Sequence, residues 1–349
     1  MSASSFSGFP ADARILGLDI GSISVDVVLL DGLGTPLYSR YVRHHGQPDK
    51  VLCAELEALE RTHAGIAAAV TGTGADRVGR LLGACAVNEV IAQVAAASFR
   101  CPQARSVIDI GGQDSKYIQL EPAGEGDGLR LKDFSVSSMC ASGTGSFLDQ
   151  QATRLGLDIE TEFGTGAFID QMATLLHLTP SEMNELSKRQ NKIYAIASRC
   201  GVFAKSDMIH LQQKGTPVED IVAGLCHALA RSFKANVVGV KALELPVALV
   251  GGVAANAGVV KALRSVLHLE EDGLFVPEDF ALSGAFGAAL FLLGGQGEAV
   301  PYKGLAAFRE GLRQRVTMKT LVPLQPVSVS PPGCRGSSDA GPKVSAGFM

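Results

Sequence analysis

The 349-residue sequence contains no tryptophan, and aromatic residues make up only 6% of it. It has no surplus of positive charge either: the formal net charge is −4, which gives no indication of a polyanion-binding surface. The most apolar stretch, residues 281–293, is too short and too interrupted by glycine to span a bilayer. Residues 1–14 lack the apolar core of a secretory signal. These absences predict a cytoplasmic protein that binds neither nucleic acid nor membrane.

Cysteine is scattered through the chain, and no two cysteines form a CxxC pair or a zinc-binding spacing. The seven cysteines are Cys53, Cys85, Cys101, Cys140, Cys200, Cys226 and Cys334. An odd, dispersed set argues against a disulfide framework and favours small buried thiols. Cys140 and Cys200 differ from the others because each stands between a predicted strand and a predicted helix. A thiolate is stabilised at a helix N-terminus, so for this pair a ligand role and a structural role are equally open.

Two similar units dominate what is present. The segment RILGLDIGSISVDVVLL predicts a hairpin with Asp19 at the tip of its first strand, followed by Gly21 and Ser22. Residues 107–120 repeat this pattern 90 positions later, with Asp109 followed by Gly111, Gly112 and Gln113. Each carboxylate could be an ordinary turn cap. As a pair, they predict two α/β lobes of similar topology whose cleft binds Mg²⁺ and a nucleotide.

Two further glycine turns precede predicted helices. In MCASGTGSFLDQQ the turn Gly143, Thr144 and Gly145 leads into a helix, whose N-terminus attracts anions. The predicted strand 246–250 ends at Gly251 and Gly252, before a helix over residues 257–267. Asn256 is either a hydrogen-bonding partner for a ligand there or the N-cap of that helix, and the sequence favours neither.

The sequence predicts a two-lobed chain. We expect a disordered N-terminus (residues 1–13), lobe I (14–104), lobe II (105–282) with an insertion at about 157–192, a closing helix (283–300), and a basic segment with a disordered tail (301–349). Within lobe II the pattern predicts a strand over residues 193–198 and a long helix over residues 218–240. A helix is expected to begin at Ser181, without the usual glutamate at its third position.

Five ordered motifs carry a family resemblance. GLDIGSIS, VIDIGGQDSK, MCASGTGSFLDQQ, SRCGVFAKSDMIHLQQKG and GGVAANAGVVKAL resemble the ATPase activators of 2-hydroxyacyl-CoA dehydratases, which are related to the ATP-binding subunits of benzoyl-CoA reductase. The resemblance runs from about residue 14 to 293. It implies the two-lobed actin/Hsp70-like (ribonuclease H-like) fold of the acetate/sugar kinase–Hsp70–actin superfamily, with ATP in the cleft between the lobes.

The resemblance also implies a function. It predicts one [4Fe–4S] cluster per homodimer, held by Cys140 and Cys200 of each subunit, and ATP-driven electron transfer to an acyl-CoA dehydratase or reductase component, with a ferredoxin or flavodoxin as reductant. Motif matching assigns the two phosphate motifs to Gly21, Ser22, Gly111 and Gly112, the connecting turn to Gly143, Thr144 and Gly145, and the adenosine motif to Gly251, Gly252 and Asn256. Asp19 and Asp109 would hold hydrated Mg²⁺, and Gln113 would orient the attacking water.

Three features depart from the family pattern. Asp26 stands where relatives often carry lysine or threonine, and Lys205 stands where they usually carry an acid. The 60-residue separation of Cys140 and Cys200 is longer than usual. Two alternatives stay open at this point: a small-molecule kinase, for which Asp149 or Asp207 would have to act as the base, and a non-catalytic nucleotide-dependent scaffold.

Overall fold

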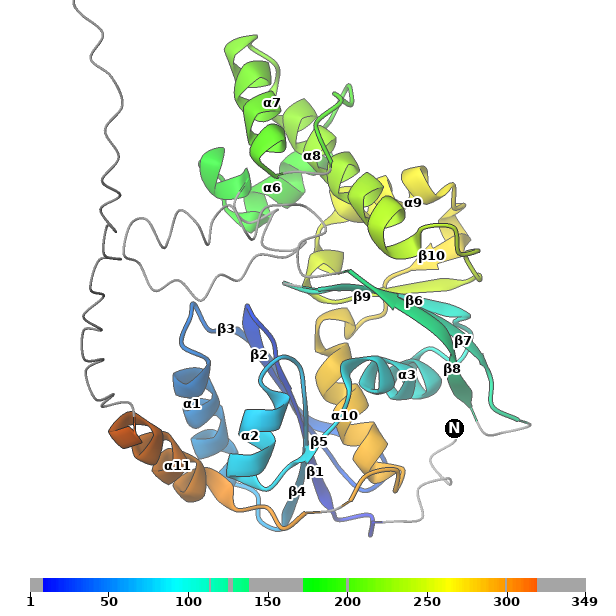
Figure 1. Cartoon of the computed structure of the whole chain (residues 1–349). Coiled ribbons are helices and arrows are strands. Elements are labelled where there is room, and N and C mark those ends of the chain that lie inside the picture. Colours follow the sequence, from blue (N-terminus) through cyan, green and yellow to red (C-terminus); the bar gives the residue numbers. More distant parts are fainter. Residues whose placement is uncertain are drawn as a thin grey trace, which may run out of the picture. The chain divides into compact units, whose positions relative to one another are not determined.

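The computed structural model describes residues 9–112, 114–124, 128–137, 172–198, 201–298 and 300–318 (Figure 1). Its strands form two mixed sheets of five strands each. The first sheet has the order β3-β2-β1-β4-β5 and consists of β1 (Arg14–Ile20), β2 (Ser24–Leu30), β3 (Pro36–Arg43), β4 (Ile66–Thr71) and β5 (Cys85–Ala86). The second has the order β10-β9-β6-β7-β8 and consists of β6 (Ser106–Ile110), β7 (Ser115–Pro122), β8 (Leu129–Val136), β9 (Val247–Val250) and β10 (Leu274–Phe275).

The two sheets repeat one topology. In each, the first strand pairs antiparallel with the next strand in sequence and parallel with a later one, as β1 does with β2 and β4 and as β6 does with β7 and β9. The outer strands follow the same directions in both sheets. The internal repeat that the two Asp–Gly hairpins predicted is therefore confirmed, together with the two-lobed fold class.

Helices pack on the sheets and on one another (Figure 1). They are α1 (Pro48–Glu60), α2 (Ala75–Leu82), α3 (Glu89–Arg100), α6 (Pro180–Ser187), α7 (Gly201–Gln213), α8 (Val218–Phe233), α9 (Ala257–Leu267), α10 (Ser283–Leu293) and α11 (Gly304–Met318). The apolar α10 packs on β1, β4 and α3, while α3 also contacts β7 and β8 of the second sheet. Helices α8 and α9 pack on each other and form the core on the other face of that sheet.

Close packing between α10 and its neighbours depends on glycine. A Cβ atom at Gly17 of β1 would overlap the carbonyl oxygen of Ala285, and one at Gly287 would overlap the carbonyl oxygen of Ala92 on α3. The backbones of α10, β1 and α3 are thus in direct contact. This fixes the first hairpin and α3, both of which reach the site described below.

The segment over residues 193–198 is not a strand, contrary to the prediction. Side chains on neighbouring helices take the place of a strand partner. Asp207 Oδ2 accepts a hydrogen bond from the backbone N–H of Ala197 at 2.8 Å, and Arg231 Nη2 donates to the carbonyl of Ile196 at 2.8 Å. The apolar run therefore does not join a sheet, and two of its backbone groups are satisfied by side chains instead.

Two helix boundaries also differ from the prediction. Helix α6 begins at Pro180 behind the N-cap Thr179, and Glu182 completes a capping box with Thr179, so the glutamate judged missing is present two positions earlier. The long helix predicted over residues 218–240 ends as an α-helix at Phe233 and continues as a π-helical turn, Lys234–Val238.

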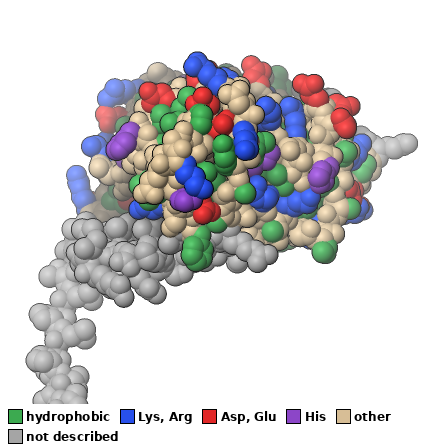
Figure 2. Space-filling model, turned by 90° about the horizontal axis from the view of Figure 1, so that it is seen from above, with side chains coloured by type: hydrophobic (Ala, Val, Ile, Leu, Met, Phe, Trp, Pro, Cys, Tyr) green, Lys and Arg blue, Asp and Glu red, His purple; other side chains and the backbone are tan. Residues whose placement is uncertain are grey.

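Residues up to Gly311 pack as one unit, and those from Leu312 belong to a second. Among the described residues, no helix combines the length and the apolar character that a membrane crossing requires. Figure 2 views the molecule from the side on which α7 and α8 lie in Figure 1, and it shows cationic and anionic side chains interspersed on that face.

Candidate functional site

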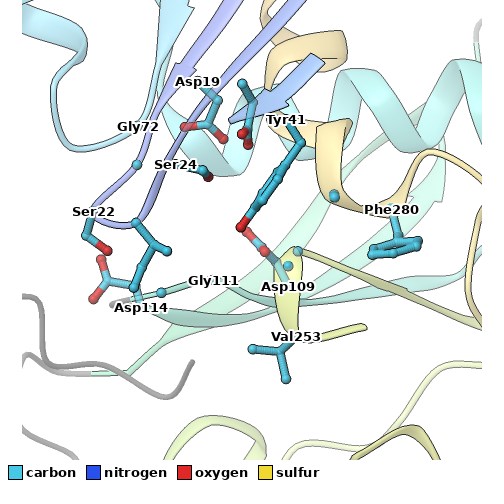
Figure 3. A pocket seen from close by; sticks show the side chains of 18 of the residues that line it. Asp19, Ser22, Ser24, Tyr41, Gly72, Asp109, Gly111, Asp114, Val253 and Phe280 are labelled. Carbon is cyan, nitrogen blue, oxygen red and sulfur yellow. The ribbon is translucent and has the colours of Figure 1, made fainter. Parts of the chain in front are cut away.

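A cavity of about 590 Å³ lies where the hairpins of the two sheets meet (Figure 3). The structure brings together here every predicted site residue that it describes: Asp19, Gly21, Ser22, Asp109, Gly111, Gly112, Gly251, Gly252 and Asn256. The other predicted site residues lie outside the described residues: Gln113, Cys140, Gly143, Thr144, Gly145 and Cys200. The geometry thus joins the two Asp–Gly turns at one cavity, and the individual roles stay predictions.

The buried position of Asp19 disfavours the charged form of its carboxyl group. Burial, together with the negative charges of Glu89 and Asp109, raises the pKa of Asp19 to about 7 against the opposing effect of Lys116. A Cβ atom at Gly284, at the start of α10, would overlap Asp19 Oδ2, so only glycine leaves room for this carboxyl group. Such a carboxylate gains strongly from a cation placed beside it.

Asp109, in contrast, has its charge compensated from within the protein. Lys116 Nζ lies 3.6 Å from Asp109 Oδ2 and 2.6 Å from Glu89 Oε2. Gln93 Nε2 donates a hydrogen bond to Asp109 Oδ2 at 3.2 Å. Burial raises the pKa of Asp109, and the ammonium group of Lys116 offsets part of that rise. On Lys116 itself burial favours the neutral amine, but the two carboxylates outweigh it and raise the pKa above the usual value.

A glycine in the left-handed region flanks each aspartate. Gly72 follows β4 with φ +88°, and Gly251 follows β9 with φ +86°. A Cβ atom at Gly72 would overlap Asp19 Oδ1, and one at Gly251 would lie 2.7 Å from Asp109 Oδ1. Both lobes therefore use the same device, in which the parallel neighbour of the aspartate strand turns sharply past the carboxyl group. Gly251 was predicted as a site residue, whereas Gly72 was not.

Asn256 is the N-cap of α9. Its Oδ1 accepts hydrogen bonds from the backbone N–H groups of Gly258 at 3.0 Å and Val259 at 3.2 Å. Of the two interpretations that the sequence left open, the cap is thus confirmed, while the side chain still lines the cavity. Asn184 of α6 also lines it, and its Oδ1 accepts from the backbone N–H of Ala257 at 2.8 Å. The insertion predicted in lobe II therefore contributes part of the cavity wall.

Several lining residues were missed from the sequence: Asp26, Thr71, Glu89, Gln93, Asp114 and Lys116. Some left a signal. Lys116 stands in the VIDIGGQDSK motif, and Glu89 and Gln93 are polar residues four positions apart on the largely apolar α3, which places them on one face. Asp26 was noted only as a departure from the family pattern, and Thr71 ends an apolar strand without any special context.

The lining fits a nucleotide with a divalent cation. Three cavity-lining oxygen atoms are buried without a hydrogen-bond partner: Ser22 Oγ, Asp26 Oδ1 and Thr71 Oγ1. The described residues contain no group of three His, Cys, Asp or Glu side chains that could hold a metal ion. A cation here would take its remaining ligands from water and phosphate, as Mg²⁺ does in nucleotide sites.

Two lobes of one topology that enclose a polar cavity between two strand–Asp–Gly turns define a nucleotide-binding ATPase of the actin and sugar-kinase fold class. The sequence comparison is more specific, because residues 16–291 match the model of the BadF/BadG/BcrA/BcrD ATPase family. The chain belongs to this family, which confirms the resemblance drawn from the five motifs.

Two relatives of this chain are named as activators of acyl-CoA dehydratases. The chain is 32% identical over 205 residues to the 2-hydroxyisocaproyl-CoA dehydratase activator of Clostridioides difficile, covering 59% of this chain and 66% of that one. It is 31% identical over 280 residues to the activator of lactoyl-CoA dehydratase of Anaerotignum propionicum, covering 79% and 96%. The solved structure of the Clostridium difficile activator with bound ADPNP matches with a TM-score of 0.65 and 27% identity, over 88% of this chain and 99% of that one.

Proposed function

We propose that this protein is an iron–sulfur ATPase that couples ATP hydrolysis to low-potential single-electron transfer to a 2-hydroxyacyl-CoA dehydratase or a related acyl-CoA reductase. The observation that carries the proposal is the family match over residues 16–291, since this range contains the polar cavity and both Cys140 and Cys200. The relatives named as dehydratase activators support the partner class.

The cavity supplies the nucleotide half of this function. ATP provides the free energy through cleavage of its terminal phosphoanhydride bond. The glycine turns at Gly21, Gly111 and Gly251 line the cavity without side chains, so the backbone can approach phosphate oxygens closely. Lys116 favours the ionised form of Asp109 and holds it in place, and the carboxyl group of Asp19 is available to a hydrated cation.

Cys140 and Cys200 supply the ligands of the iron–sulfur cluster. Helix α7 begins at Gly201, directly after Cys200, so a thiolate there is followed by a helix N-terminus. A cubane cluster needs four thiolates, and two copies of this chain related by a two-fold axis supply them from Cys140 and Cys200.

A chain of packed helices links the two halves. Asn256, at the cavity, caps α9; α9 packs on α8; and α8 packs on α7. A change in the nucleotide that shifts α9 would thereby reach the N-terminus of α7, and moving that end alters the field at Cys200. Asp207 of α7 is hydrogen-bonded to the backbone of Ala197 and does not line the cavity, so it is not placed to act as a kinase base.

Anaerobic purification followed by iron and sulfide analysis tests this proposal. We expect about four irons per dimer, and loss of the cluster in Cys140→Ala and in Cys200→Ala. Cys226→Ala is the matched control, because Cys226 is a buried thiol in the core of α8. Iron-free wild-type protein after anaerobic reconstitution would refute the proposal. A phosphorylated small-molecule product formed from ATP would favour the kinase alternative.

A further inference from the structure

Three oxygen-bearing side chains stand in one row across the first sheet. Asp19 of β1 is in register with Asp26 of the antiparallel strand β2 and with Thr71 of the parallel strand β4. Residues in register on neighbouring strands direct their side chains to the same face of a sheet. All three line the cavity.

Asp26 and Thr71, which flank Asp19 in this row, are buried, and each has an oxygen atom without a hydrogen-bond partner. Asp26 is 6% exposed and Thr71 is 0% exposed, and neither Asp26 Oδ1 nor Thr71 Oγ1 has a hydrogen-bond partner. The carboxyl group of Asp26 interacts with the hydroxyl of Ser24, which leaves Oδ1 as its open atom. Buried polar atoms without partners are rare and costly in folded proteins, so two of them flanking one carboxylate indicate a missing ligand.

The equivalent row in the second sheet has a different composition. There Asp109 is in register with Lys116 on the antiparallel strand and with Val250 on the parallel strand. Asp26 thus occupies the position in lobe I that Lys116 occupies in lobe II. The second lobe compensates its aspartate with an ammonium group, whereas the first lobe adds a second carboxylate beside Asp19 and supplies no cation in this row.

The charge of the described cavity lining also indicates that a cation binds here. Its carboxyl groups are those of Asp19, Asp26, Glu89, Asp109 and Asp114, and its cationic side chains are those of Arg43 and Lys116. Lys116 is already paired with Glu89 and Asp109. A polyphosphate would add further negative charge to this excess of carboxylates, so its binding requires a multivalent cation close to the row.

We propose that Asp26 and Thr71 act together with Asp19 to hold the divalent cation that accompanies the nucleotide. The proposal rests on the nucleotide-binding part of the function proposed above. Carboxylate and hydroxyl oxygens are hard ligands of the kind that Mg²⁺ and Mn²⁺ prefer, and water and phosphate complete the shell. Asp109, held by Lys116 and Gln93, is then a positioning residue rather than a second holder of the cation.

Binding of Mn²⁺ in the presence of ADP, followed by the electron paramagnetic resonance of free Mn²⁺, tests this assignment on the full chain. We expect Asp26→Asn to weaken Mn²⁺ binding by about 10- to 100-fold. Asp26→Lys should abolish Mn²⁺ binding, because it places an ammonium group beside Asp19, as Lys116 lies beside Asp109 in the second sheet. Thr71→Val should weaken it less. Asp76→Asn, an equal charge change on the exposed face of α2, is the matched control and should bind Mn²⁺ as the wild type does.

The outcomes separate this inference from the proposed function. Wild-type protein that binds neither ADP nor Mn²⁺ overturns both. Protein in which Asp26→Asn and Thr71→Val bind Mn²⁺ and ADP with wild-type affinity overturns the cation row alone. If Asp26→Asn does not fold, as judged by circular dichroism, Thr71→Val carries the test, since it removes only the hydroxyl group. Reduced Mn²⁺ affinity with an unchanged circular dichroism spectrum supports the assignment.

Discussion

Replacing Lys116 by methionine should destabilise the protein in a way that depends on pH. The ammonium group is buried 3.6 Å from Asp109 and 2.6 Å from Glu89. At an effective dielectric constant of about 20, a charge pair at 3.6 Å gains about 5 kcal/mol before desolvation is subtracted. Removing one partner of a buried pair costs about 3–5 kcal/mol. Because the Glu89 side chain is 32% exposed and regains water, we expect a loss of about 3 kcal/mol for Lys116→Met at neutral pH.

The sign of the pH dependence follows from Asp109. Burial already raises the pKa of Asp109, and Lys116 lowers it more than Gln93 does, so Lys116→Met raises this pKa further. In the variant, Asp109 stays protonated when folded at pH values where it is ionised when unfolded. The free energy of unfolding therefore falls as the pH rises from about 4 towards the raised pKa, and the deficit relative to wild type is larger at pH 8 than at pH 5.

Urea unfolding of the nucleotide-free protein, followed by circular dichroism at pH 5 and pH 8, measures this effect. Lys132→Met is the matched control, because its ammonium group pairs with Glu244 at the surface and should contribute little. A variant as stable as wild type, or a deficit of equal size at both pH values, would refute the electrostatic account of Lys116.

Three further predictions concern the same site. Gly251→Ala should abolish nucleotide binding in a filter or fluorescence assay, because φ is +86° and the new Cβ meets both Asp109 and the carbonyl of Ile110; wild-type binding would contradict this. Asn256→Ala should cost about 1 kcal/mol in urea unfolding by removing the α9 cap, whereas Asn256→Asp should restore most of it. Asp19→Asn, with EDTA present, should reduce the decline of stability between pH 4 and pH 7, since the raised pKa of Asp19 causes stability to fall over this range; an unchanged pH profile would contradict it.

The parts of the fold that local pattern determines could be predicted from the sequence. Alternating apolar residues around an Asp–Gly turn specify a hairpin, and two such hairpins specify the repeat that both sheets show. The prediction of a strand over residues 193–198 was wrong, because an apolar run does not reveal whether a neighbouring strand exists to pair with it. Two of its backbone groups are satisfied instead by Asp207 and Arg231, which lie 10 and 35 positions away in sequence.

The site was predictable only where glycine and aspartate mark the turns. The glycines and aspartates of the two hairpins were found because their local chemistry is distinctive. Thr71 and Glu89 were missed because their importance comes from register and from packing between elements that are distant in sequence. Asp26 was visible as an unusual residue, but only its register with Asp19 and the contrast with Lys116 give it a role.

The coupling of nucleotide to electron is the central claim, and one measurement tests it directly. The reduction potential of the anaerobically purified dimer can be titrated by electron paramagnetic resonance with ADP and again with a non-hydrolysable ATP analogue. If the nucleotide at Asp19 and Asp109 moves α7 against the cluster, the two potentials should differ, and a shift of about 60 mV corresponds to a tenfold change in the equilibrium. Equal potentials in the two nucleotide states, or the absence of any iron–sulfur signal, would contradict the account.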